Sequence, residues 1–378
     1  MSAQRPTPDP ARPVRVCLVG PSLDILGGQA VQVQRLLARL AEIPTLAVDF
    51  LAVNPRLPGP LGALQRVKYV RTAATSAAYG ASLLRRLRRY DVVHAFSASY
   101  WSYLLAPLPA LAVAKAYGRR TVLNYRSGEA DDHLGRSRVA VDSIRRLVDA
   151  VVTPSGYLVD VFARHGLRAQ SIVNFVEVEA IPYRARPTPG AAERPVFLSN
   201  RNLEPMYNVA CVLRAFARVQ ARVPGARLVV AGFGSQRAPL EALAAELGLR
   251  NVDWRGRVRP EEMPALYDAA DVYLNAPDID NMPNSVIEAY AAGLPVATTD
   301  AGGIPYIVEH ERTGLMVPRG DDGALAAAAL RLLDEPGLAA RLSAAGRAEC
   351  LAKYVWPAVR DEWERLYLGL AGRTGAAA

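Results

Sequence analysis

The chain has 378 residues, which is too long for one compact core and fits two domains of ~150 to 200 residues each. Its 51% apolar and 21% charged residues exclude wholesale disorder, collagen-like repeats and disulfide scaffolds. The three cysteines, Cys17, Cys211 and Cys350, stand far apart in no metal-ligand spacing, and this usage favours a reducing cytoplasm.

The net charge of +9 is unevenly distributed. Residues 1–185 hold 24 basic against 13 acidic residues, giving +11, and residues 186–378 hold 21 against 23, giving −2. Arginine makes up 42 of the 45 basic residues, so the abundance of arginine by itself is weak evidence for an anion-binding site. The asymmetry predicts an anionic surface or substrate near the first half. Nucleic acid is not expected, since no reader motif is present and the basic residues are not interleaved with aromatic ones.

Residues 1–13 are polar and proline-rich and predict a flexible tail. They contain no apolar segment typical of a signal peptide. The longest apolar stretch, residues 103–113, is short and broken by Pro107 and Pro109, so we expect no membrane span and a cytoplasmic protein.

Residues 14–183 alternate between two kinds of segment. The apolar run VRVCLVG at 14–20 ends in glycine and is followed by a loop and a helix-like stretch at 29–41. Four more strand-like runs follow at helix-length intervals, with the sequences TLAVDFLAV, DVVHAFS, TVLNYRS and AVVTPS. This alternation predicts a first α/β domain with a parallel sheet covered by helices.

Residues 184–195 are dense in proline and small residues and predict an interdomain linker. The alternation then starts again and predicts a second α/β domain over 196–354. A final helix is expected over 355–372, where the spacing of its aromatic residues predicts a docking face. Two α/β domains of similar design predict a ligand cleft between them.

Residues 276–308 are the most informative stretch. A strand ends, a loop carries Asp278 and Asp280, and a helix begins near Asn284 with Glu288 about one turn inside. The free amides and positive dipole end of a helix N-terminus suit a diphosphate. Glu288 would then accept hydrogen bonds from a neutral diol such as ribose. The alternative is an acidic residue that only stabilises its own helix.

Several motifs follow one another in a recognisable order. After the first strand come Gly27 and Gly28, then DVVH ending at His94, TPS, Asn174, Arg201, the Gly232/Gly234 turn, RGRV and the 276–308 stretch with TGLMVP behind it. Over roughly 340 residues this order resembles the group-one, mannosyltransferase-like family of retaining glycosyltransferases. The resemblance implies two facing Rossmann-like domains of the GT-B fold, with the final helix crossing back to the first domain.

The resemblance also implies roles for single residues. Arg201 would neutralise the donor diphosphate, Asp280 would bind sugar hydroxyls and Glu288 would hold the ribose, with a surface cation as the alternative for Arg201. The other implied donor contacts are Gly27, Gly28, Gly232, Gly234, Val258, Asn281, Met282, Asn284 and Ser285. The implied acceptor side comprises His94, Phe96 and Arg126.

Four positions depart from the family pattern. Tyr207 stands where a phosphate-binding lysine is common, Phe96 replaces a second histidine, Pro283 replaces a glycine, and Arg126 replaces a histidine. Arg126 could supply the charge lost at Tyr207, or could be an ordinary surface residue. These changes leave the fold secure and concern donor choice and activity.

The resemblance implies a metal-independent, retaining hexosyltransferase that moves a sugar from a nucleotide-sugar to a hydroxyl acceptor by front-side displacement, with no further cofactor. The acceptor would be a glycan, a lipid-linked molecule or a small molecule. The acidic cluster GEADDH at 128–133 could suggest a metal site, but the resemblance disfavours one there. A pyridoxal-phosphate phosphorylase is disfavoured, because Lys353 is the one lysine of the second half. The alternative from another class is a degenerate member that binds a nucleotide-sugar or a partner without turnover.

The run ASLLRRLRRY carries four arginines, at 85, 86, 88 and 89, around three leucines. A solvated helix is one interpretation. The other is peripheral contact between the Arg85 to Arg89 region and an anionic membrane, which would place the protein at the inner membrane face.

Overall fold

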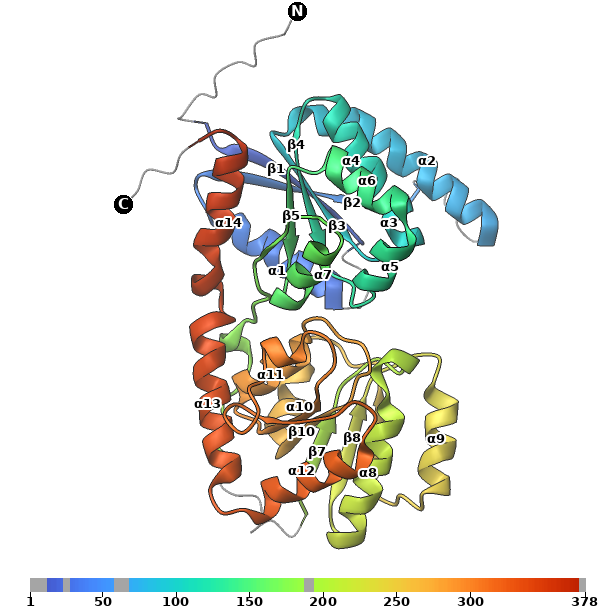
Figure 1. Cartoon of the computed structure of the whole chain (residues 1–378), viewed down its shortest axis with the longest axis vertical. Helices are drawn as coiled ribbons and strands as arrows, with labels where there is room; N and C mark the ends of the chain where they lie inside the picture. Colours follow the sequence, from blue (N-terminus) through green and yellow to red (C-terminus); the bar gives the residue numbers. More distant parts are fainter. Residues whose placement is uncertain (1–11, 23–27, 58–67, 187–193, 374–378) are drawn as a thin grey trace, which may run out of the picture. The chain divides into compact units, whose positions relative to one another are not determined.

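A computed structural model describes residues 12–22, 28–57, 68–186 and 194–373 (Figure 1). The chain divides into two compact units: unit 1 comprises 1–172 and 359–378, and unit 2 comprises 173–358. The division falls ahead of the boundary expected after residue 183, because Val176 and Ile181 are buried in the core of unit 2.

Unit 1 contains a six-stranded, fully parallel sheet of order β2-β1-β3-β4-β5-β6. Its strands are β1 (Val14–Gly20), β2 (Leu46–Ala52), β3 (Val92–Ser97), β4 (Arg120–Tyr125), β5 (Ala150–Thr153) and β6 (Gln170–Ser171). Its helices are α1 (Gly28–Leu40), α2 (Lys68–Arg86), α3 (Trp101–Leu105), α4 (Pro107–Ala116), α5 (Ala130–Arg136), α6 (Arg138–Leu147), α7 (Gly156–Arg164) and most of α14 (Trp356–Leu370).

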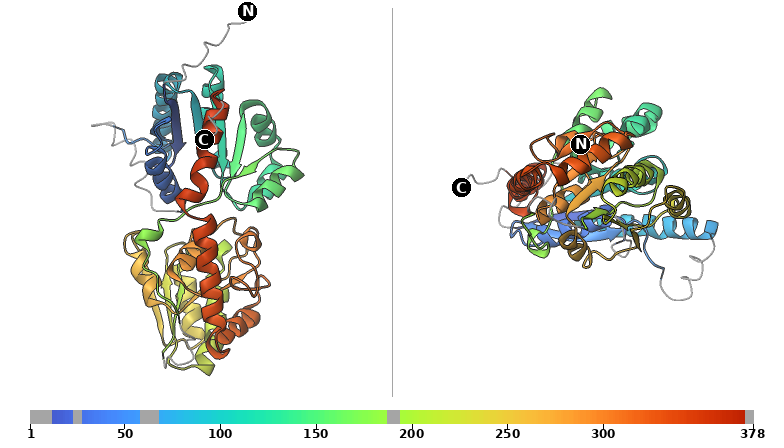
Figure 2. Two further views of the ribbon diagram at one scale, coloured as in Figure 1. Left: turned by 90° about the vertical axis from the view of Figure 1, so that its left-hand side faces the viewer. Right: turned by 90° about the horizontal axis from the view of Figure 1, so that it is seen from below.

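Alternation along β3 assigns its side chains to opposite faces of that sheet. Val93 and Ala95 belong to the core cluster that also takes residues from α2, α4 and α7. His94 and Phe96 point to the other face, and His94 meets aromatic residues of α14 there. The left panel of Figure 2 shows α14, in red, lying along unit 1. The aromatic stripe expected to be a docking face is this contact.

Unit 2 repeats the design with sheet order β12-β11-β10-β7-β8-β9, again fully parallel. Its strands are β7 (Val196–Ser199), β8 (Arg227–Ala231), β9 (Val252–Gly256), β10 (Val272–Asn275), β11 (Val296–Thr299) and β12 (Leu315–Val317). Its helices are α8 (Val209–Arg222), α9 (Arg237–Glu246), α10 (Met263–Ala269), α11 (Asn284–Ala292), α12 (Asp322–Asp334) and α13 (Leu338–Lys353).

Two apolar cores cover the two faces of the second sheet. One core joins the strands to α8, α9, α12 and the start of α13, and the other joins them to α10, α11 and the end of α13. Because helices cover both faces of the sheet, β10 and β11 are buried at every position, including the polar Asn275, Thr298 and Thr299 at their carboxyl ends. The predicted α/β class with two parallel sheets is confirmed.

In each unit the strand order reverses once, between β1 and β3 and between β7 and β10. In doubly wound sheets ligands bind outside the carboxyl ends of the strands at this switch point. The loops that follow β7 and β10 are therefore the first place to look for a site in unit 2, and those that follow β1 and β3 in unit 1.

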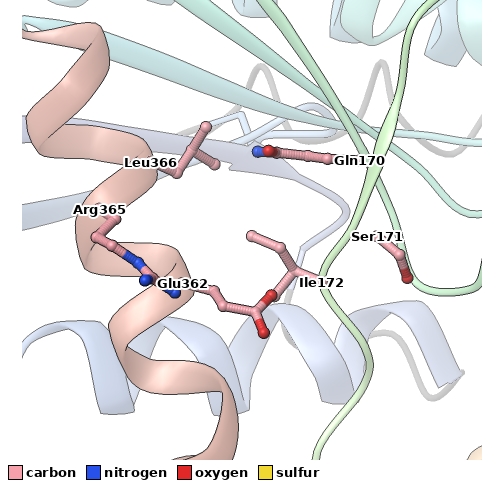
Figure 3. A pocket seen from close by; sticks show the side chains of 6 residues that line it. All are labelled: Gln170, Ser171, Ile172, Glu362, Arg365 and Leu366. Atoms are coloured by element: carbon pink, nitrogen blue, oxygen red, sulfur yellow. The ribbon is translucent and has the colours of Figure 1, made fainter.

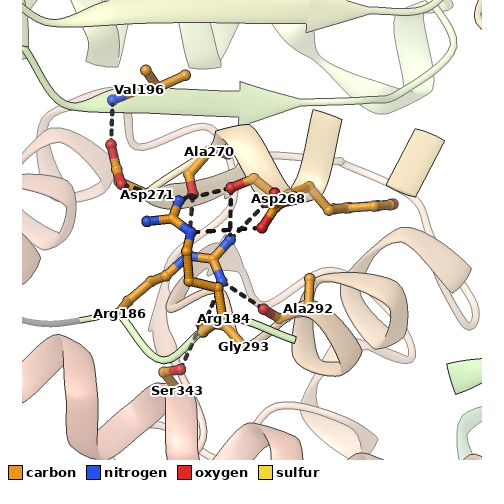
Figure 4. A network of polar contacts seen from close by, with 10 residues as sticks. Arg184, Arg186, Val196, Asp268, Ala270, Asp271, Ala292, Gly293 and Ser343 are labelled. Atoms are coloured by element: carbon orange, nitrogen blue, oxygen red, sulfur yellow. Dashed lines mark hydrogen bonds and ion pairs between the residues drawn. The ribbon is translucent and has the colours of Figure 1, made fainter. Parts of the chain in front are cut away.

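The segment predicted as a linker begins as packed chain, because Arg186 is 2% exposed inside unit 2 (Figure 4). Its guanidinium donates to the carbonyl oxygens of Tyr267 at 2.8 Å and Ala270 at 3.2 Å, at the end of α10, and of Ala292 at 2.6 Å, at the end of α11. A cation at two helix C-termini satisfies orphan carbonyls and complements both dipoles. The linker prediction missed this set of Arg186 hydrogen bonds, which we call the Arg186 clamp. Residues 187–193 lie outside the described part of the chain.

Among the described residues, no helix is both long enough and apolar enough to cross a membrane.

Candidate donor site and acceptor side

The switch point of unit 2 brings two predicted site residues together. Arg201 follows β7 and Asp280 follows β10, 79 positions later. Arg201 Nη2 donates to Asp280 Oδ2 at 2.5 Å, and Arg201 Nη1 donates to Ser285 Oγ at 3.0 Å. The side chains of Arg201 and Asp280 are only 10% and 11% exposed. The loop after β10 and the first turn of α11 therefore meet the loop after β7 through one guanidinium.

The ring of Tyr207 lies against the guanidinium, with Arg201 Cζ 4.2 Å from its centroid. A stacked aromatic ring fixes the plane of an arginine and attracts its charge. Burial acts to lower the pKa of Arg201, but opposing electrostatic interactions, chiefly with the Asp280 carboxylate, raise it overall, so the charge is kept. Tyr207, at the position where the family commonly has a phosphate-binding lysine, therefore contacts the Arg201 guanidinium.

Two predicted glycines hold the Arg201 loop. A Cβ at Gly232 would lie 2.0 Å from the Arg201 carbonyl oxygen, and one at Gly234 would lie 2.3 Å from the Leu203 carbonyl oxygen. Neither contact is possible for a larger residue, so glycine is required for this close approach. The glycines were expected to admit phosphates; the structure places them against the backbone that carries Arg201.

A third glycine, Gly303, holds the Asp280 loop. Its N–H donates to the Asp280 carbonyl at 3.1 Å, and a Cβ there would lie 1.7 Å from the Asn281 carbonyl oxygen. Sequence analysis did not single it out, although it follows β11 at the same sheet edge as the other site loops.

Asn174 fixes the approach to α11. Its Nδ2 donates to the Met282 carbonyl at 3.3 Å and to Asn284 Oδ1 at 2.8 Å. Asn281 and Met282 are buried, and Pro283 stands at the N-cap position of α11 without a side-chain cap. The first amides of α11, at Asn284 and Ser285, have no carbonyl within the helix to bond, as at any helix N-terminus.

Glu288 lies one turn into α11 and accepts a 2.9 Å hydrogen bond from the Tyr267 hydroxyl. That hydroxyl in turn accepts from Asn200 Nδ2 at 2.5 Å. Tyr267 is 1% exposed, and burial raises its pKa well above the usual range, so it donates as a neutral phenol. Sequence analysis missed Tyr267 because its only local signal is the helical pattern of α10.

Several buried polar atoms line the same sheet edge. Ser199 Oγ, Asn200 Oδ1, Arg201 Nε and Asn275 Oδ1 have no hydrogen-bond partner within the described part of the chain. They lie at the ends of β7 and β10 or just beyond. Polar atoms of this kind at a switch point are those that a bound ligand or water satisfies.

The remaining donor candidates are less informative. Val258 is half-buried in the connection from β9 to α10. Gly28 is the first residue of α1, and Gly27 lies outside the described residues.

In unit 1, His94 is fully buried between Phe96, stacked with ring centroids 4.7 Å apart, and Trp363 at 5.4 Å. Its Nδ1 shares a 2.6 Å hydrogen bond with the Tyr367 hydroxyl. Burial, with a smaller contribution from the Arg126 charge, lowers the pKa of His94 to about 3. The imidazole is therefore neutral, and the structure places it against α14 rather than at the surface.

Arg126 follows β4, with its Cζ 5.9 Å from the Phe96 ring centroid. Its Nη1 donates to Asn124 Oδ1 at 3.2 Å, and burial lowers its pKa to about 10, so it remains charged near neutral pH. The three acceptor-side candidates thus form one cluster on β3 and β4. Arg126 lies in unit 1 and Arg201 in unit 2.

An aromatic pair that sequence analysis missed follows β3. Tyr100 has φ 57° and ψ −126°, a strained conformation for a residue with a Cβ. Trp101, directly after it, is 73% exposed. The aromatic run SYWSY after a predicted strand was the available signal.

The acidic cluster at 128–133 sends its side chains to separate partners. Asp131 pairs with Arg164 at 3.1 Å and His165 at 2.9 Å, Asp132 pairs with Arg136 at 2.7 Å, and His133 turns inward. No group of three or more potential metal ligands occurs in the described ranges.

The arginine run spans the end of α2 and the 3-10 turn Leu87–Arg89 that follows it. Arg85, Arg88 and Arg89 are exposed, and Leu84 beside them is 55% exposed. Arg86 differs, because its Nη2 donates to the Phe50 carbonyl at 3.2 Å and to the Tyr90 hydroxyl at 3.3 Å. Three of the four arginines are therefore available to an external anion.

A pocket of about 380 Å³ lies elsewhere in unit 1, between β6 and α14 (Figure 3). It is lined by Gln170, Ser171, Ile172, Glu362, Arg365 and Leu366. None of the predicted site residues lines it.

Comparison with known proteins agrees with this architecture. Two α/β units, each with a fully parallel sheet, and a terminal helix whose residues are divided between the units are features of the GT-B class of glycosyltransferases, and solved structures share the fold. A sucrose-phosphate synthase from Thermosynechococcus elongatus has a TM-score of 0.74 at 20% identity and covers 95% of this chain and 99% of its own. HepE from Anabaena, in complex with UDP and glucose, has a TM-score of 0.73 at 18% identity and covers 93% and 99%.

The sequence comparisons give the family. Residues 185–349 match the description "Glycosyl transferases group 1". A GDP-mannose-dependent alpha-(1-6)-phosphatidylinositol monomannoside mannosyltransferase of Mycobacterium tuberculosis is 30% identical over 313 residues, 76% of this chain and 80% of that protein. A glycogen synthase of the same species is 30% identical over 294 residues, 74% and 69% respectively. The chain belongs to the group 1 glycosyl transferases and is a glycosyltransferase, as the resemblance implied.

Proposed function

We propose that unit 2 binds a nucleoside-diphosphate sugar, with the diphosphate at Arg201 and the N-terminus of α11, the ribose at Glu288 and the sugar near Asp280. The observation that carries this proposal is the convergence of these groups at one switch point, where Arg201 contacts both Asp280 and Ser285. A charged fork beside free helix amides suits a diphosphate. The named relative's use of GDP-mannose makes that donor the first to test.

The proposed reaction retains the configuration of the sugar by front-side displacement. The acceptor hydroxyl attacks from the side of the leaving group, and a diphosphate oxygen takes its proton, so no protein nucleophile is needed. Arg201 and the α11 amides stabilise the charge that develops on the departing diphosphate. In this scheme those groups do the work of a metal ion, which makes transfer metal-independent.

The proposed acceptor is a hydroxyl group of a glycan or lipid-linked sugar, bound by unit 1. Support comes from Arg126 and the exposed Trp101, which lie just beyond the carboxyl ends of β4 and β3, and from the buried Phe96, whose ring centroid lies 5.9 Å from Arg126 Cζ. An indole face offers an apolar platform to a sugar ring. The names of two relatives also point this way, since one mentions a phosphatidylinositol monomannoside, a glycolipid, and the other mentions glycogen, a glycan.

Peripheral contact with an anionic membrane is part of the same proposal. The exposed arginines at 85, 88 and 89 beside Leu84 combine positive charge with apolar area. Such contact would bring a lipid-linked acceptor to unit 1 and place the protein at the inner membrane face.

The decisive experiment is hydrolysis of a panel of nucleotide-sugars, led by GDP-mannose and UDP-glucose, by the purified protein. Release of the nucleoside diphosphate from one donor supports the proposal. Binding without turnover, for every donor and with acceptors added, supports a degenerate member instead. That second candidate is favoured by the neutralisation of Arg201 by Asp280 and by Tyr207 at the family's lysine position.

A further inference from the structure

The cation of the donor site already has an anionic partner. Asp280 Oδ2 lies 2.5 Å from Arg201 Nη2, and both side chains are about nine-tenths buried. The pair presents no net charge to a dianionic diphosphate, and Tyr207 supplies none. A diphosphate that approached the intact pair would meet the Asp280 carboxylate at the guanidinium edge where it needs to bind.

Other contacts would keep the Arg201 guanidinium in place if its hydrogen bond to Asp280 were broken. Ser285 Oγ accepts a hydrogen bond from Arg201 Nη1, and the Tyr207 ring lies against the guanidinium group. Arg201 Nε has no hydrogen-bond partner among the described groups. Asp280 also keeps a second partner, since its Oδ1 accepts from the Asn281 N–H at 2.8 Å. Opening the pair therefore leaves neither residue without a hydrogen bond.

We propose that Asp280 and the donor diphosphate compete for Arg201, so that donor binding exchanges one anion for the other on Nη2. This inference rests on the proposed function and adds a role for Asp280 before any sugar is bound. Arg201 stays paired throughout the exchange, which avoids leaving a buried charge uncompensated. The released Oδ2 becomes free to accept a hydroxyl of the donor sugar, which is the role that the family resemblance implies for Asp280.

The proposal predicts that Asp280 opposes binding of a nucleoside diphosphate that carries no sugar. Isothermal titration calorimetry with GDP and UDP would compare the parent protein with Asp280→Asn and with Asp278→Asn. Asp278 lies in the same loop, and its Oδ1 accepts from Asn208 Nδ2 at 3.0 Å. The Asp278 variant removes the same formal charge without touching Arg201 and serves as the matched control.

The Asp280→Asn variant is expected to bind the nucleoside diphosphate at least tenfold more tightly, while Asp278→Asn changes affinity less than threefold. Turnover of the full donor by Asp280→Asn should fall, because the sugar loses its carboxylate contact. A merely structural role would weaken both binding and turnover. Unchanged or weaker binding by folded Asp280→Asn overturns the inference.

Should Asp280→Asn fail to fold, a structure of the parent protein with GDP or UDP bound decides the question. Separation of Arg201 Nη2 from Asp280 Oδ2 beyond 4 Å, with a phosphate oxygen in its place, supports the exchange. An intact pair beside a bound diphosphate overturns it and leaves the proposed function standing. If the parent protein binds no nucleoside diphosphate, the proposed function and the exchange fail together.

Discussion

The Tyr267 hydroxyl donates a 2.9 Å hydrogen bond to Glu288 and accepts one from Asn200. Three elements therefore converge on the carboxylate proposed to hold the ribose: α11 carries it, α10 supplies the phenol, and the loop after β7 supplies the amide. Tyr267 orients Glu288 and does not itself need to touch the donor. It is a positioning residue in the proposed site.

Replacing Tyr267 by phenylalanine is expected to raise the donor KM about tenfold with little change in kcat, because a hydrogen bond to a charged group such as the Glu288 carboxylate contributes ~1.5 kcal/mol. Steady-state kinetics with the donor found in the panel would check this. Tyr290→Phe is the matched control, since Tyr290 is buried in α11, the helix that carries Glu288, and donates to Thr313 Oγ1 at 2.9 Å. Equal effects of the two changes would reduce Tyr267 to a core residue.

Replacing Glu288 by glutamine is expected to weaken donor binding tenfold or more, because a carboxylate accepts from both hydroxyls of a diol more strongly than an amide does. The dissociation constant, measured by calorimetry for the donor, gives the answer. A variant with parent affinity and parent turnover would contradict the ribose assignment and leave Glu288 as a residue that stabilises α11.

Replacing Arg201 by alanine is expected to lower turnover roughly a hundredfold, with a smaller loss of donor affinity, because charge on the diphosphate grows in the transition state. Arg201→Lys should be intermediate, since it keeps the charge and loses the fork. If folded Arg201→Ala turned over donor at the parent rate, the diphosphate would be held elsewhere, and Arg126 would be tested next.

His94 is expected to make the protein acid-labile. Its folded-state pKa of about 3 lies below the unfolded value of ~6.5, so the unfolded chain binds more protons between these values. Stability is then fully present above pH ~6.5 and is lost as pH falls, by on the order of 4 kcal/mol. Unfolding midpoints measured from pH 7 to 4 should depend less on pH in His94→Gln than in the parent protein. The control His310→Gln, whose side chain is 49% exposed in the parent, should keep the parent's pH dependence.

Replacing Arg186 by methionine is expected to cost ~3 kcal/mol or more, because it strands buried carbonyls at the ends of α10 and α11. Thermal denaturation would show the loss. Arg194→Met, at the far end of the expected linker, is the control and should change the midpoint little. A midpoint equal to that of the parent would mean that the clamp is dispensable.

Charge reversal at Arg85 and Arg88 is expected to abolish salt-sensitive binding to vesicles that contain phosphatidylglycerol, because each basic residue contributes ~1 kcal/mol near such a surface. Sedimentation with vesicles at low and high salt measures this. The matched control reverses Arg218 and Arg222 of α8, which are 62% and 67% exposed. Vesicle binding that depended neither on salt nor on Arg85 and Arg88 would contradict the membrane contact and leave this segment as a solvated helix end.

The sequence by itself determined the two α/β units and the loops of the donor site. Apolar runs of strand length and helix-period segments are local signals, and their alternation leaves little freedom beyond a covered parallel sheet. Asp280 could be placed in the loop that leads into the helix carrying Glu288, because only eight positions of chain separate the two residues. Motif order then named the family, which no single residue could.

Only the tertiary structure decided which partners these residues have. Arg201 meets Asp280 across 79 positions of sequence, and His94 meets Tyr367 across 273. The proline-rich composition of 184–195 predicted a linker and gave no sign that Arg186 is buried against carbonyls of two helices. Such pairings depend on how strands order themselves in a sheet and how helices pack on it, and residue patterns along the chain carry no information about contacts made across it.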